Sequence, residues 1–385
     1  MYLQRELESD IRSALQHYPA VAILGPRQCG KSTLVKYLLR NVEQSLYLDL
    51  ERPSDQQKLV DPEWFLTTQN QKLICLDEVQ RMPELFPLLR SLMDEYGRNG
   101  MYLILGSASR DLIRQSSESL AGRIHFNRLT PFLFSEINHH TDLETYLSRG
   151  GLPRSLLAAD DAVSFRWRED FISTFLERDL LQFTGFTPVT MRRLWQMLAH
   201  MNGQTVNYSK LGNALGISHP TVRKYIDLLE GTFMVIQLRP YHSNTKKRLI
   251  KSPKVYLSDT GIVAALLQLQ NFDQVAGHPV FGTLWEGLVL QQLKGHFPKL
   301  ELSFYRTNHG HEIDLVLMHR SRIIAIQCKA SAAPALSNGN YRALDDINPE
   351  KCFVVAPVSG GYSMHKAIEV VTIHELIEKI REWIH

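Results

Sequence analysis

The pattern of apolar positions in the first third of the chain alternates between helical and strand periods. Apolar residues recur at helical spacing within residues 1–20, and the uninterrupted apolar run 21–24 predicts a short buried strand. A helical pattern returns in residues 34–39. Further apolar runs of strand length follow at 45–50, 72–76 and 101–105. Strands that alternate with helices indicate an α/β fold, with a parallel sheet covered by helices on both faces.

The rest of the chain shows three further patterns. Residues 153–179 carry an apolar stripe typical of amphipathic helices, and we expect them to link neighbouring domains. Residues 208–231 predict two helices joined by a tight turn, with strand-like stretches at 233–239 and 254–257. From residue 281 the pattern predicts a helix, three strands, a helix, a strand and a helix. The domains expected from these patterns are 1–150, 151–200, 201–258 and 259–385.

Composition narrows the class of protein. The chain has 385 residues, which suggests two to four domains, and its 44% hydrophobic and 22% charged content is that of a globular protein. Four cysteines without a C-x-x-C pair argue against a disulfide framework and a structural zinc site. No apolar run has the length of a signal peptide core or a membrane span, so we expect a cytoplasmic protein with no membrane partner. The net charge of +3 is too small by itself to imply a polyanionic partner, so the argument for such a partner rests on local clusters of basic residues.

A glycine-rich loop joins the first predicted strand to the next helix. It fits the pattern G-x-x-x-x-G-K-[ST], which brings backbone N–H groups and a helix N-terminus toward a polyphosphate. We expect Lys31 to reach the β- and γ-phosphates of ATP and the hydroxyl of Ser32 to hold Mg²⁺. The residues of this loop are Gly25, Pro26, Arg27, Gln28, Cys29, Gly30, Lys31, Ser32 and Thr33.

Candidate catalytic residues follow two later strands. Asp77 and Glu78 come directly after an apolar strand, where Asp77 would hold the water shell of Mg²⁺ and Glu78 would orient or deprotonate the attacking water. Ser107 ends the next buried strand and could reach the attacking water or the γ-phosphate, or could simply be a turn residue. Arg123 is the best candidate for an arginine that acts across a subunit boundary, although solvated helix-face arginines are common.

Together the segments GPRQCGKS, LDEVQ, LILGSAS, SLAGR, LTPFLFSEI and GGLPR resemble bacterial and archaeal AAA-type ATPases with a winged-helix and nuclease-like C-terminal region. The resemblance covers nearly the whole chain, in the order of the family. It implies that Lys31 and Ser32 are the Walker A residues, Asp77 and Glu78 the Walker B pair, and Ser107 the first sensor. It assigns the arginine finger to Arg123 less firmly.

The helix pair at 208–231 fits a helix-turn-helix whose second helix could enter a DNA major groove. A basic run between the two strands that follow would form a wing that touches phosphates. Winged helices also serve as protein interfaces, and a lysine-rich loop can simply be solvated. The candidate DNA-binding residues are Thr221, Arg223, Lys224, Lys246, Lys247 and Arg248.

The predicted C-terminal strands carry a second candidate site. A period of two places Glu312 and Asp314 on one face of their strand, and Gln327 and Lys329 on one face of the next. If the strands pair, Asp314, Gln327 and Lys329 converge, and Glu286 is available from the preceding helix. Oxygen ligands suit Mg²⁺, and a neighbouring lysine could activate a water.

This second arrangement resembles the PD-(D/E)XK nuclease superfamily, a restriction-endonuclease-like α/β fold. The resemblance implies that Asp314 is the metal-binding aspartate, Lys329 the motif lysine and Glu286 the helix acid. Gln327 departs from it, because the superfamily usually has glutamate there, and a neutral amide binds Mg²⁺ more weakly. A degenerate nuclease fold used for docking is the alternative.

Three hypotheses about function follow from the sequence. The first is an ATP-hydrolysing motor or switch that acts on DNA, as a ring or other homo-oligomer. The second is a nucleotide-controlled signalling or defence switch whose winged helix binds protein. The third is a metal-dependent nuclease.

Overall fold

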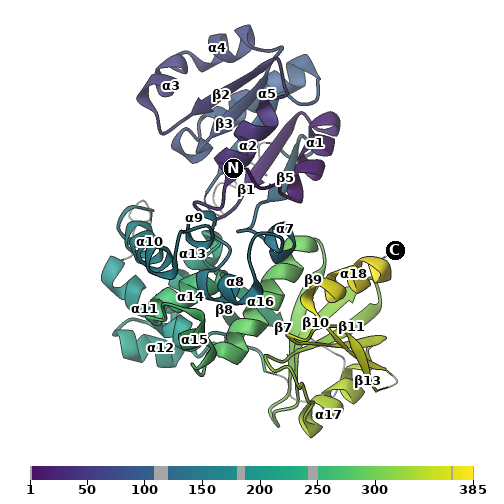
Figure 1. The fold of residues 1–385 in the computed structure, drawn as a ribbon. Coiled ribbons are helices and arrows are strands. Elements are labelled where there is room, and N and C mark those ends of the chain that lie inside the picture. Colours follow the sequence, from purple (N-terminus) through teal and green to yellow (C-terminus); the bar gives the residue numbers. More distant parts are fainter. Residues whose placement is uncertain (1, 108–119, 180–186, 242–249, 366, 385) are drawn as a thin grey trace. The chain divides into compact units, whose positions relative to one another are not determined.

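The computed structural model describes residues 2–107, 120–179, 187–241, 250–365 and 367–384. The chain forms two compact units, shown in Figure 1. The first comprises Met1–Phe132 with Gly231–Phe233, and the second comprises Leu133–Glu230 and Met234–His385. The predicted Lys246, Lys247 and Arg248 lie outside the described residues.

The first unit is built on a parallel five-stranded sheet. The strands have the order β2-β3-β4-β1-β5, so β4 lies between β1 and β3. Their bounds are β1 (Ala20–Leu24), β2 (Ser45–Asp49), β3 (Leu73–Asp77), β4 (Tyr102–Gly106) and β5 (Ile124–Arg128). Every described pair of neighbours in this sheet is parallel, as the alternating pattern predicts.

Helices cover both faces of this sheet. Ala20 and Ala22 of β1 belong to one apolar cluster with Leu89 of α5, whereas Val21 and Ile23 belong to a second cluster with α1 and α2. Because successive strand residues point to opposite faces, the two clusters are the two sides of one sheet. The helices are α1 (Leu7–His17), α2 (Lys31–Leu39), α3 (Pro53–Lys58), α4 (Pro62–Thr68) and α5 (Leu85–Tyr96). The predicted α/β fold of this unit is therefore confirmed.

The second unit begins with a helical region. The stripe predicted at 153–179 forms separate helices, because residues 157–160 leave the helical path and Asp160 caps the next helix by accepting from the Val163 N–H at 2.8 Å. The predicted helix pair at 208–231 is present as α12 and α13. The helices before the large sheet are α7 (Phe134–Ile137), α8 (Leu143–Arg149), α9 (Pro153–Leu156), α10 (Asp161–Thr174), α11 (Pro188–His200), α12 (Tyr208–Leu215) and α13 (His219–Gly231). A π-helix, Phe175–Asp179, continues α10.

A nine-stranded sheet runs through the rest of the second unit, in the order β13-β14-β12-β11-β10-β9-β7-β8-β6. The parallel pairing of β7 with β9, with Arg239 opposite Ser303, joins strands that the sequence places in separate domains. The strands are β6 (Gln204–Thr205), β7 (Val235–Pro240), β8 (Lys254–Leu257), β9 (Glu301–Arg306), β10 (Glu312–His319), β11 (Arg322–Cys328), β12 (Lys351–Val355), β13 (Tyr362–His365) and β14 (Ile368–Val371). The hairpin of β13 and β14 is absent from the sequence-based expectation.

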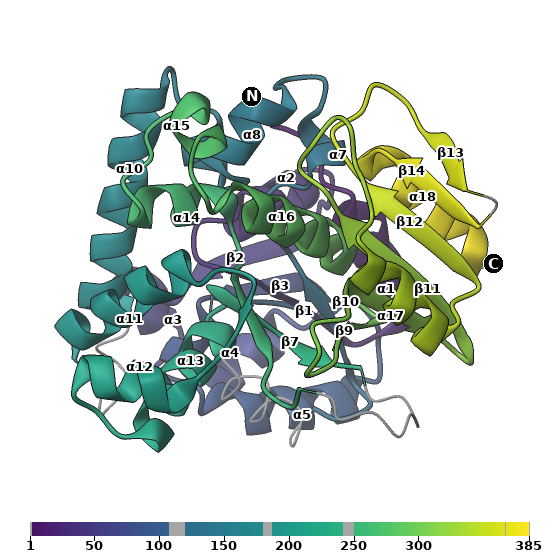
Figure 2. The same cartoon turned by 90° about the horizontal axis from the view of Figure 1, so that it is seen from below.

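Helices pack along this sheet. Figure 2 shows α18 beside β12 and β14 at the C-terminal end of the chain. Trp285 of α16 is buried and donates its indole N–H to the Val355 carbonyl of β12 at 3.0 Å, which ties α16 to the sheet. The remaining helices are α14 (Thr260–Leu266), α15 (Phe272–Ala276), α16 (Phe281–His296), α17 (Asn338–Ile347) and α18 (Ile373–Ile384).

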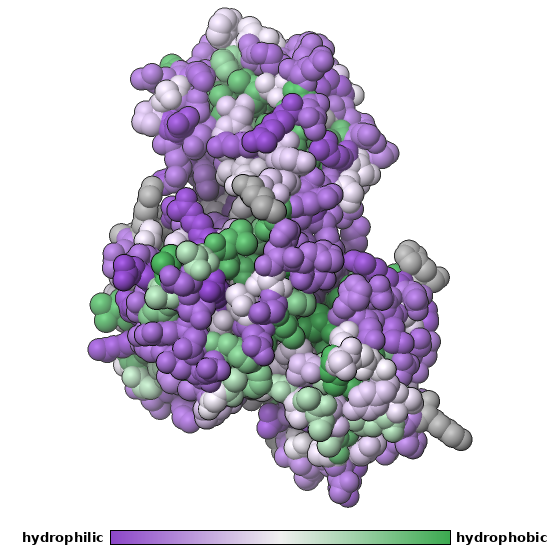
Figure 3. Space-filling view, in the orientation of Figure 1, coloured by the Kyte–Doolittle hydropathy of each residue, from purple (hydrophilic) through white to green (hydrophobic). Residues whose placement is uncertain are grey.

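On the face shown in Figure 3, the surface of each unit is mostly hydrophilic, and smaller apolar areas lie among the hydrophilic residues. Among the helices that the structure describes, none combines the length and hydropathy needed to cross a bilayer.

Candidate active site

The glycine-rich loop connects the end of β1 to the start of α2, as expected. A Cβ on Gly25 would lie 2.1 Å from the Leu129 carbonyl oxygen, so only glycine fits there. Gly30 has φ of 102°, and this left-handed backbone turns the chain into the helix. The first N–H groups of α2 have no acceptor within the helix, so they are available to an anion at the loop.

Two basic side chains hold the carbonyl groups of the loop. Lys31 is 5% exposed, and its ammonium donates to the Gly25 and Pro26 carbonyls at 2.9 Å each. Arg5, before α1, donates to the Cys29 carbonyl at 3.1 Å and to the Thr130 carbonyl at 2.8 Å. These bonds hold the backbone of the loop and keep the ammonium of Lys31 against the Gly25 and Pro26 carbonyls. The Cys29 side chain is fully buried against Leu129, so it does not line the binding surface.

Ser32 and Asp77 meet at the carboxyl ends of β1 and β3. The Ser32 hydroxyl donates to Asp77 Oδ2 at 2.7 Å, and the hydroxyl of Tyr47, on β2, donates to the same oxygen. Burial, and then the hydrogen bond to Asp77, raise the pKa of Tyr47, so it remains a donor. Asp77 Oδ1 is buried and has no hydrogen-bond partner among the described residues. A hydroxyl beside a carboxylate with a spare oxygen is a donor set that suits hydrated Mg²⁺.

Glu78 follows directly and is held by two polar neighbours. Its backbone is left-handed, with φ of 56°, a conformation that costs a non-glycine residue energy and often marks a functional position. Ser107, at the end of β4, donates to Glu78 Oε2 at 3.0 Å. The amide of Gln80 donates to the same oxygen and also contacts Ser107 Oγ at 3.3 Å. Because β4 lies between β1 and β3, this group is positioned beside the loop.

Arg123 lies away from these residues. It immediately precedes β5, whose first residue Ile124 is level with Ala20, the first residue of β1. It is therefore at the amino edge of the sheet, a strand length of about 15 Å from the loop. Its guanidinium forms a two-point ion pair with Asp94, at 2.5 and 3.0 Å. Arg123 thus lies too far from the glycine-rich loop of its own chain to act there. Its role as an arginine finger across a subunit boundary stays a prediction.

The helix pair presents part of the predicted DNA-binding set. Arg223 and Lys224 are exposed on α13 and Thr221 is half-buried, whereas Val222 and Ile226 face the core. The turn before α13 is made by Gly216, which has φ of 68°. The helix therefore directs its basic residues outward, as its periodicity predicts.

The C-terminal strands bring together three of the four predicted residues. Asp314 of β10 and Gln327 of β11 adjoin the paired residues Leu315 and Ile326, and the Gln327 amide donates to Asp314 Oδ2. Glu286 of α16 joins them through a residue that the sequence analysis missed, Lys254 of β8, whose ammonium lies 2.8 Å from Glu286 Oε1 and 4.0 Å from Asp314 Oδ1. The Lys329 side chain is half-buried, and the described contacts include no hydrogen bond or ion pair from it to Asp314.

The electrostatics of this carboxylate cluster are unusual. Burial, and then the charge of Glu286, raise the pKa of Asp314 to about 7. Burial lowers the pKa of Lys254, but the three carboxylates around it outweigh that effect and raise it, so the lysine stays charged. No group of three or more His, Cys, Asp or Glu residues among those described has the arrangement of a metal site. In this structure Glu286 and Asp314 lie against the ammonium of Lys254, and the metal centre expected from Glu286, Asp314 and Gln327 stays a prediction.

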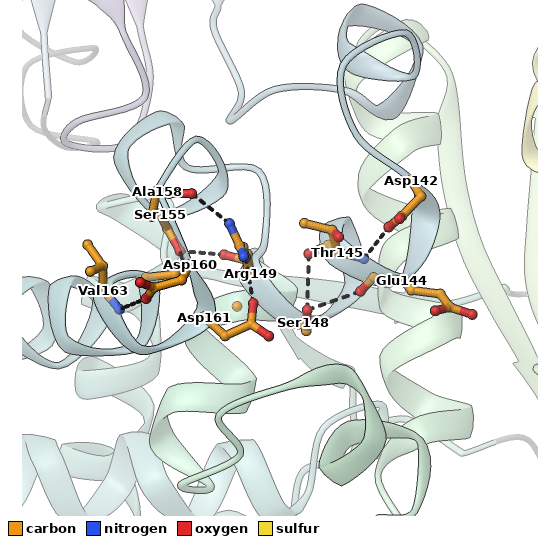
Figure 4. A network of polar contacts seen from close by, with 12 residues as sticks. Asp142, Glu144, Thr145, Ser148, Arg149, Ser155, Ala158, Asp160, Asp161 and Val163 are labelled. Carbon is orange, nitrogen blue, oxygen red and sulfur yellow. Dashed lines mark hydrogen bonds and ion pairs between the residues drawn. The ribbon is translucent and has the colours of Figure 1, made fainter.

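The GGLPR segment, residues 150–154, follows α8 and forms the start of α9. Figure 4 shows Arg149 pairing with Asp161 at 2.7 Å and donating to the Ala158 carbonyl at 2.8 Å, while the Ser155 hydroxyl donates to the Arg149 carbonyl at 2.6 Å. These bonds fasten the start of α10 to the end of α8, and this connection is called the α8–α10 joint below.

A buried arginine extends this joint to α14. Arg168 is fully buried and donates to the Ser148 carbonyl at 2.7 Å and the Gly261 carbonyl at 2.9 Å. Burial lowers the pKa of Arg168 to about 10, and the charge of Asp259 opposes that shift. The guanidinium thus connects α8, α10 and α14 through backbone groups.

Four residues with roles in these sites escaped the sequence analysis: Arg5, Tyr47, Gln80 and Lys254. Gln80 stands in the LDEVQ segment with Glu78, so its closeness to Glu78 along the chain could have predicted the contact. Lys254 stands in a strand of otherwise apolar pattern, where a charged residue directed into a core needs a partner. Arg5 and Tyr47 carry no comparable signal.

Three family models match successive segments of the chain. Residues 17–138 match the AAA domain family, and residues 140–273 and 281–376 match two domains of unknown function, DUF8612 and DUF4143. An uncharacterized protein of Haemophilus influenzae is 25% identical over 272 residues, which cover 62% of this chain and 67% of that protein. Among solved structures, the Walker-type ATPase paby2304 of Pyrococcus abyssi has a TM-score of 0.48 and 16% identity, and the match covers 69% of this chain and 96% of that one.

Two mycobacterial proteins are more similar over the full length. The uncharacterized proteins Rv2008c of Mycobacterium tuberculosis and Mb2031c of Mycobacterium bovis are each 36% identical over 375 residues, which cover 97% of this chain and 84% of theirs. The chain belongs to the family of these mycobacterial proteins and has an AAA-type P-loop domain in its N-terminal unit.

Proposed function

We propose that the N-terminal unit binds ATP with Mg²⁺ and hydrolyses it. The observation that carries the proposal is the convergence, at the carboxyl edge of the sheet, of Lys31, the Ser32–Asp77 pair and Glu78 held by Ser107. The match of residues 17–138 to the AAA domain family supports it.

Each residue then has a distinct role in the reaction. The loop and α2 amides bind the phosphates, and Lys31 offers its ammonium to the β- and γ-phosphate oxygens. Ser32 and Asp77 would hold Mg²⁺, which supplies charge neutralisation on those oxygens when bound. Glu78 orients the attacking water and accepts its proton, and Ser107 fixes the carboxylate for that task.

Two variants test this proposal. In Lys31→Ala, we expect a fluorescent ATP analogue to lose affinity, because the ammonium that contacts the phosphates is gone. In Glu78→Gln, we expect ATP to bind while turnover falls about 10²- to 10⁴-fold, the usual contribution of a general base. The exposed Glu43→Gln is the matched control and should keep the turnover of the unaltered protein. Fast hydrolysis by Glu78→Gln would remove Glu78 from the mechanism.

A second part of the proposal concerns DNA. Arg223 and Lys224 are exposed side by side on the second helix of the pair, so they could contact phosphates in a groove. We expect DNA to stimulate the ATPase, and binding to weaken steeply as salt rises. The double variant Arg223→Ala/Lys224→Ala should lose DNA binding with basal ATPase intact, whereas the exposed Lys299→Ala should not.

The alternative is a nucleotide-controlled signalling or defence switch whose C-terminal region binds protein. It would show slow hydrolysis, retained ADP and no salt-sensitive DNA affinity. An ATPase assay across DNA and RNA substrates separates the two, and flat turnover across that panel would count against the DNA proposal. The mass of the ATP-bound protein, compared between the unaltered chain and Arg123→Ala, tests whether a homo-oligomer forms and uses Arg123.

A further inference from the structure

The carboxylate cluster of the second unit is arranged around a single ammonium group. Lys254 is 2% exposed, and its Nζ lies 2.7 Å from Glu312 Oε1, 2.8 Å from Glu286 Oε1 and 4.0 Å from Asp314 Oδ1. These three acids come from α16 and β10, whereas Lys254 comes from β8. The cation that the carboxylates of α16 and β10 contact is thus supplied by β8 of the same chain.

Two of the three carboxylates, Glu312 and Asp314, keep one oxygen for Lys254, whereas Glu286 Oε1 accepts from both Lys254 and the Tyr256 hydroxyl. Glu312 Oε2 pairs with Arg306 at 3.3 Å, which leaves Oε1 for the lysine. Asp314 Oδ2 accepts from the Gln327 amide and from the Cys328 N–H at 2.9 Å, so Oδ1 faces the lysine.

The amide at position 327 matches this charge balance. Gln327 donates to Asp314, and its own carbonyl oxygen accepts from the Asn340 amide at 3.1 Å. A glutamate there would place another negative charge against Asp314, whose pKa burial and Glu286 have already raised. A bound divalent ion could offset that charge, but one ammonium could not. Glutamine is therefore the residue expected beside a singly charged cation.

We propose that Lys254 is the resident cation of this site. Its ammonium takes the position that a divalent metal would need between Glu286, Glu312 and Asp314, so the cluster joins β8 to α16 and β10 without metal. The second unit is then a metal-independent scaffold rather than a Mg²⁺-dependent nuclease centre. Removing the lysine leaves the buried Glu286 and Asp314 and the half-buried Glu312 without their cation, so we expect a divalent ion to bind in its place.

The test measures Mn²⁺ binding by electron paramagnetic resonance on the full chain, stripped of metal and nucleotide. All proteins carry Asp77→Asn, so that the loop site contributes little. We expect no Mn²⁺ site that depends on Asp314 when Lys254 is present. Lys254→Ala should bind Mn²⁺ at least tenfold more tightly, and adding Asp314→Asn should remove that gain.

Thermal unfolding provides an independent measurement. Lys254→Ala leaves the carboxylates without their cation, so we expect its Tm to fall by about 10 °C and to recover when Mn²⁺ is added. Lys254→Arg keeps the charge and should neither bind Mn²⁺ nor respond to it.

Two results would overturn the proposal. One is Mn²⁺ binding by the lysine-containing protein that Asp314→Asn abolishes, a result that does not require any Lys254 variant to fold. The other is a folded Lys254→Ala protein with unchanged Tm and no gain in Mn²⁺ affinity.

Discussion

The contacts of Glu78 with Ser107 and Gln80 predict how much each neighbour contributes to turnover. Both donate to the same carboxylate oxygen, Ser107 at 3.0 Å. A hydrogen bond to a charged group is worth about 1.5–3 kcal/mol, and the lower end applies because this group is only partly buried. About 1.4 kcal/mol is a factor of ten in rate, so Ser107→Ala and Gln80→Ala should each lower kcat about tenfold.

The double variant makes the prediction sharper. Because Ser107 and Gln80 share one oxygen and contact each other at 3.3 Å, their effects should not multiply, and Ser107→Ala/Gln80→Ala should lose well under 100-fold. Steady-state ATP hydrolysis gives kcat, and a fluorescent ATP analogue gives Kd, which should stay unchanged because neither residue belongs to the loop. Gln69→Ala is the control, since it precedes the amino end of β3 at the opposite edge of the sheet. Loss of ATP affinity with unchanged kcat would refute the positioning role.

Three further predictions follow from other buried contacts. Tyr47→Phe removes a hydrogen-bond donor to Asp77, so the Mg²⁺ concentration that half-saturates ATP hydrolysis should rise about tenfold. The kcat at saturating Mg²⁺ should be preserved, and an unchanged Mg²⁺ dependence would contradict the prediction. Burial holds the folded pKa of Asp314 at about 7, above its ordinary 3.8, so its protonation stabilises the fold fully below pH 3.8 and that stability is lost as pH rises through 7. Urea unfolding followed by tryptophan fluorescence from pH 5 to 8 should show this decline, and Asp314→Asn should flatten it; equal slopes would exclude Asp314 as the cause. Arg168→Met should lower the free energy of unfolding by about 3–5 kcal/mol, because its guanidinium is buried. The control Arg166→Met, at an exposed position, should lower it by under about 0.5 kcal/mol. Comparable losses in the two variants would argue against a special role for the buried guanidinium.

The local elements were largely predictable because their signals are short-range. The loop at Gly25–Thr33, the acids at Asp77 and Glu78 and the helix pair at 208–231 each stand in one continuous segment with a clear period. A period of two correctly placed Glu312 and Asp314 on one face of β10, where both lie near Lys254, whereas the pairing of β10 with β11 was only a condition of that prediction.

The remaining features depend on contacts between distant segments. Arg5 reaches the carbonyl of Thr130 across 125 positions, and Lys254 reaches Glu286 across 32. Such pairs have no period, so only the folded chain identifies them. The joining of β7 to β9 was missed for the same reason, because a sequence pattern marks strands but not their neighbours in a sheet.

The order of strands in the second unit has a consequence for biosynthesis. Residues 1–132 hold nearly all of the first unit, so that unit can fold while the remainder is still being made. β7 cannot gain its second neighbour until β9 has left the ribosome, which at about 5–20 residues per second leaves β7 waiting several seconds after its own synthesis. We therefore expect truncation after residue 300 to yield a folded ATPase unit attached to a segment that chaperones retain.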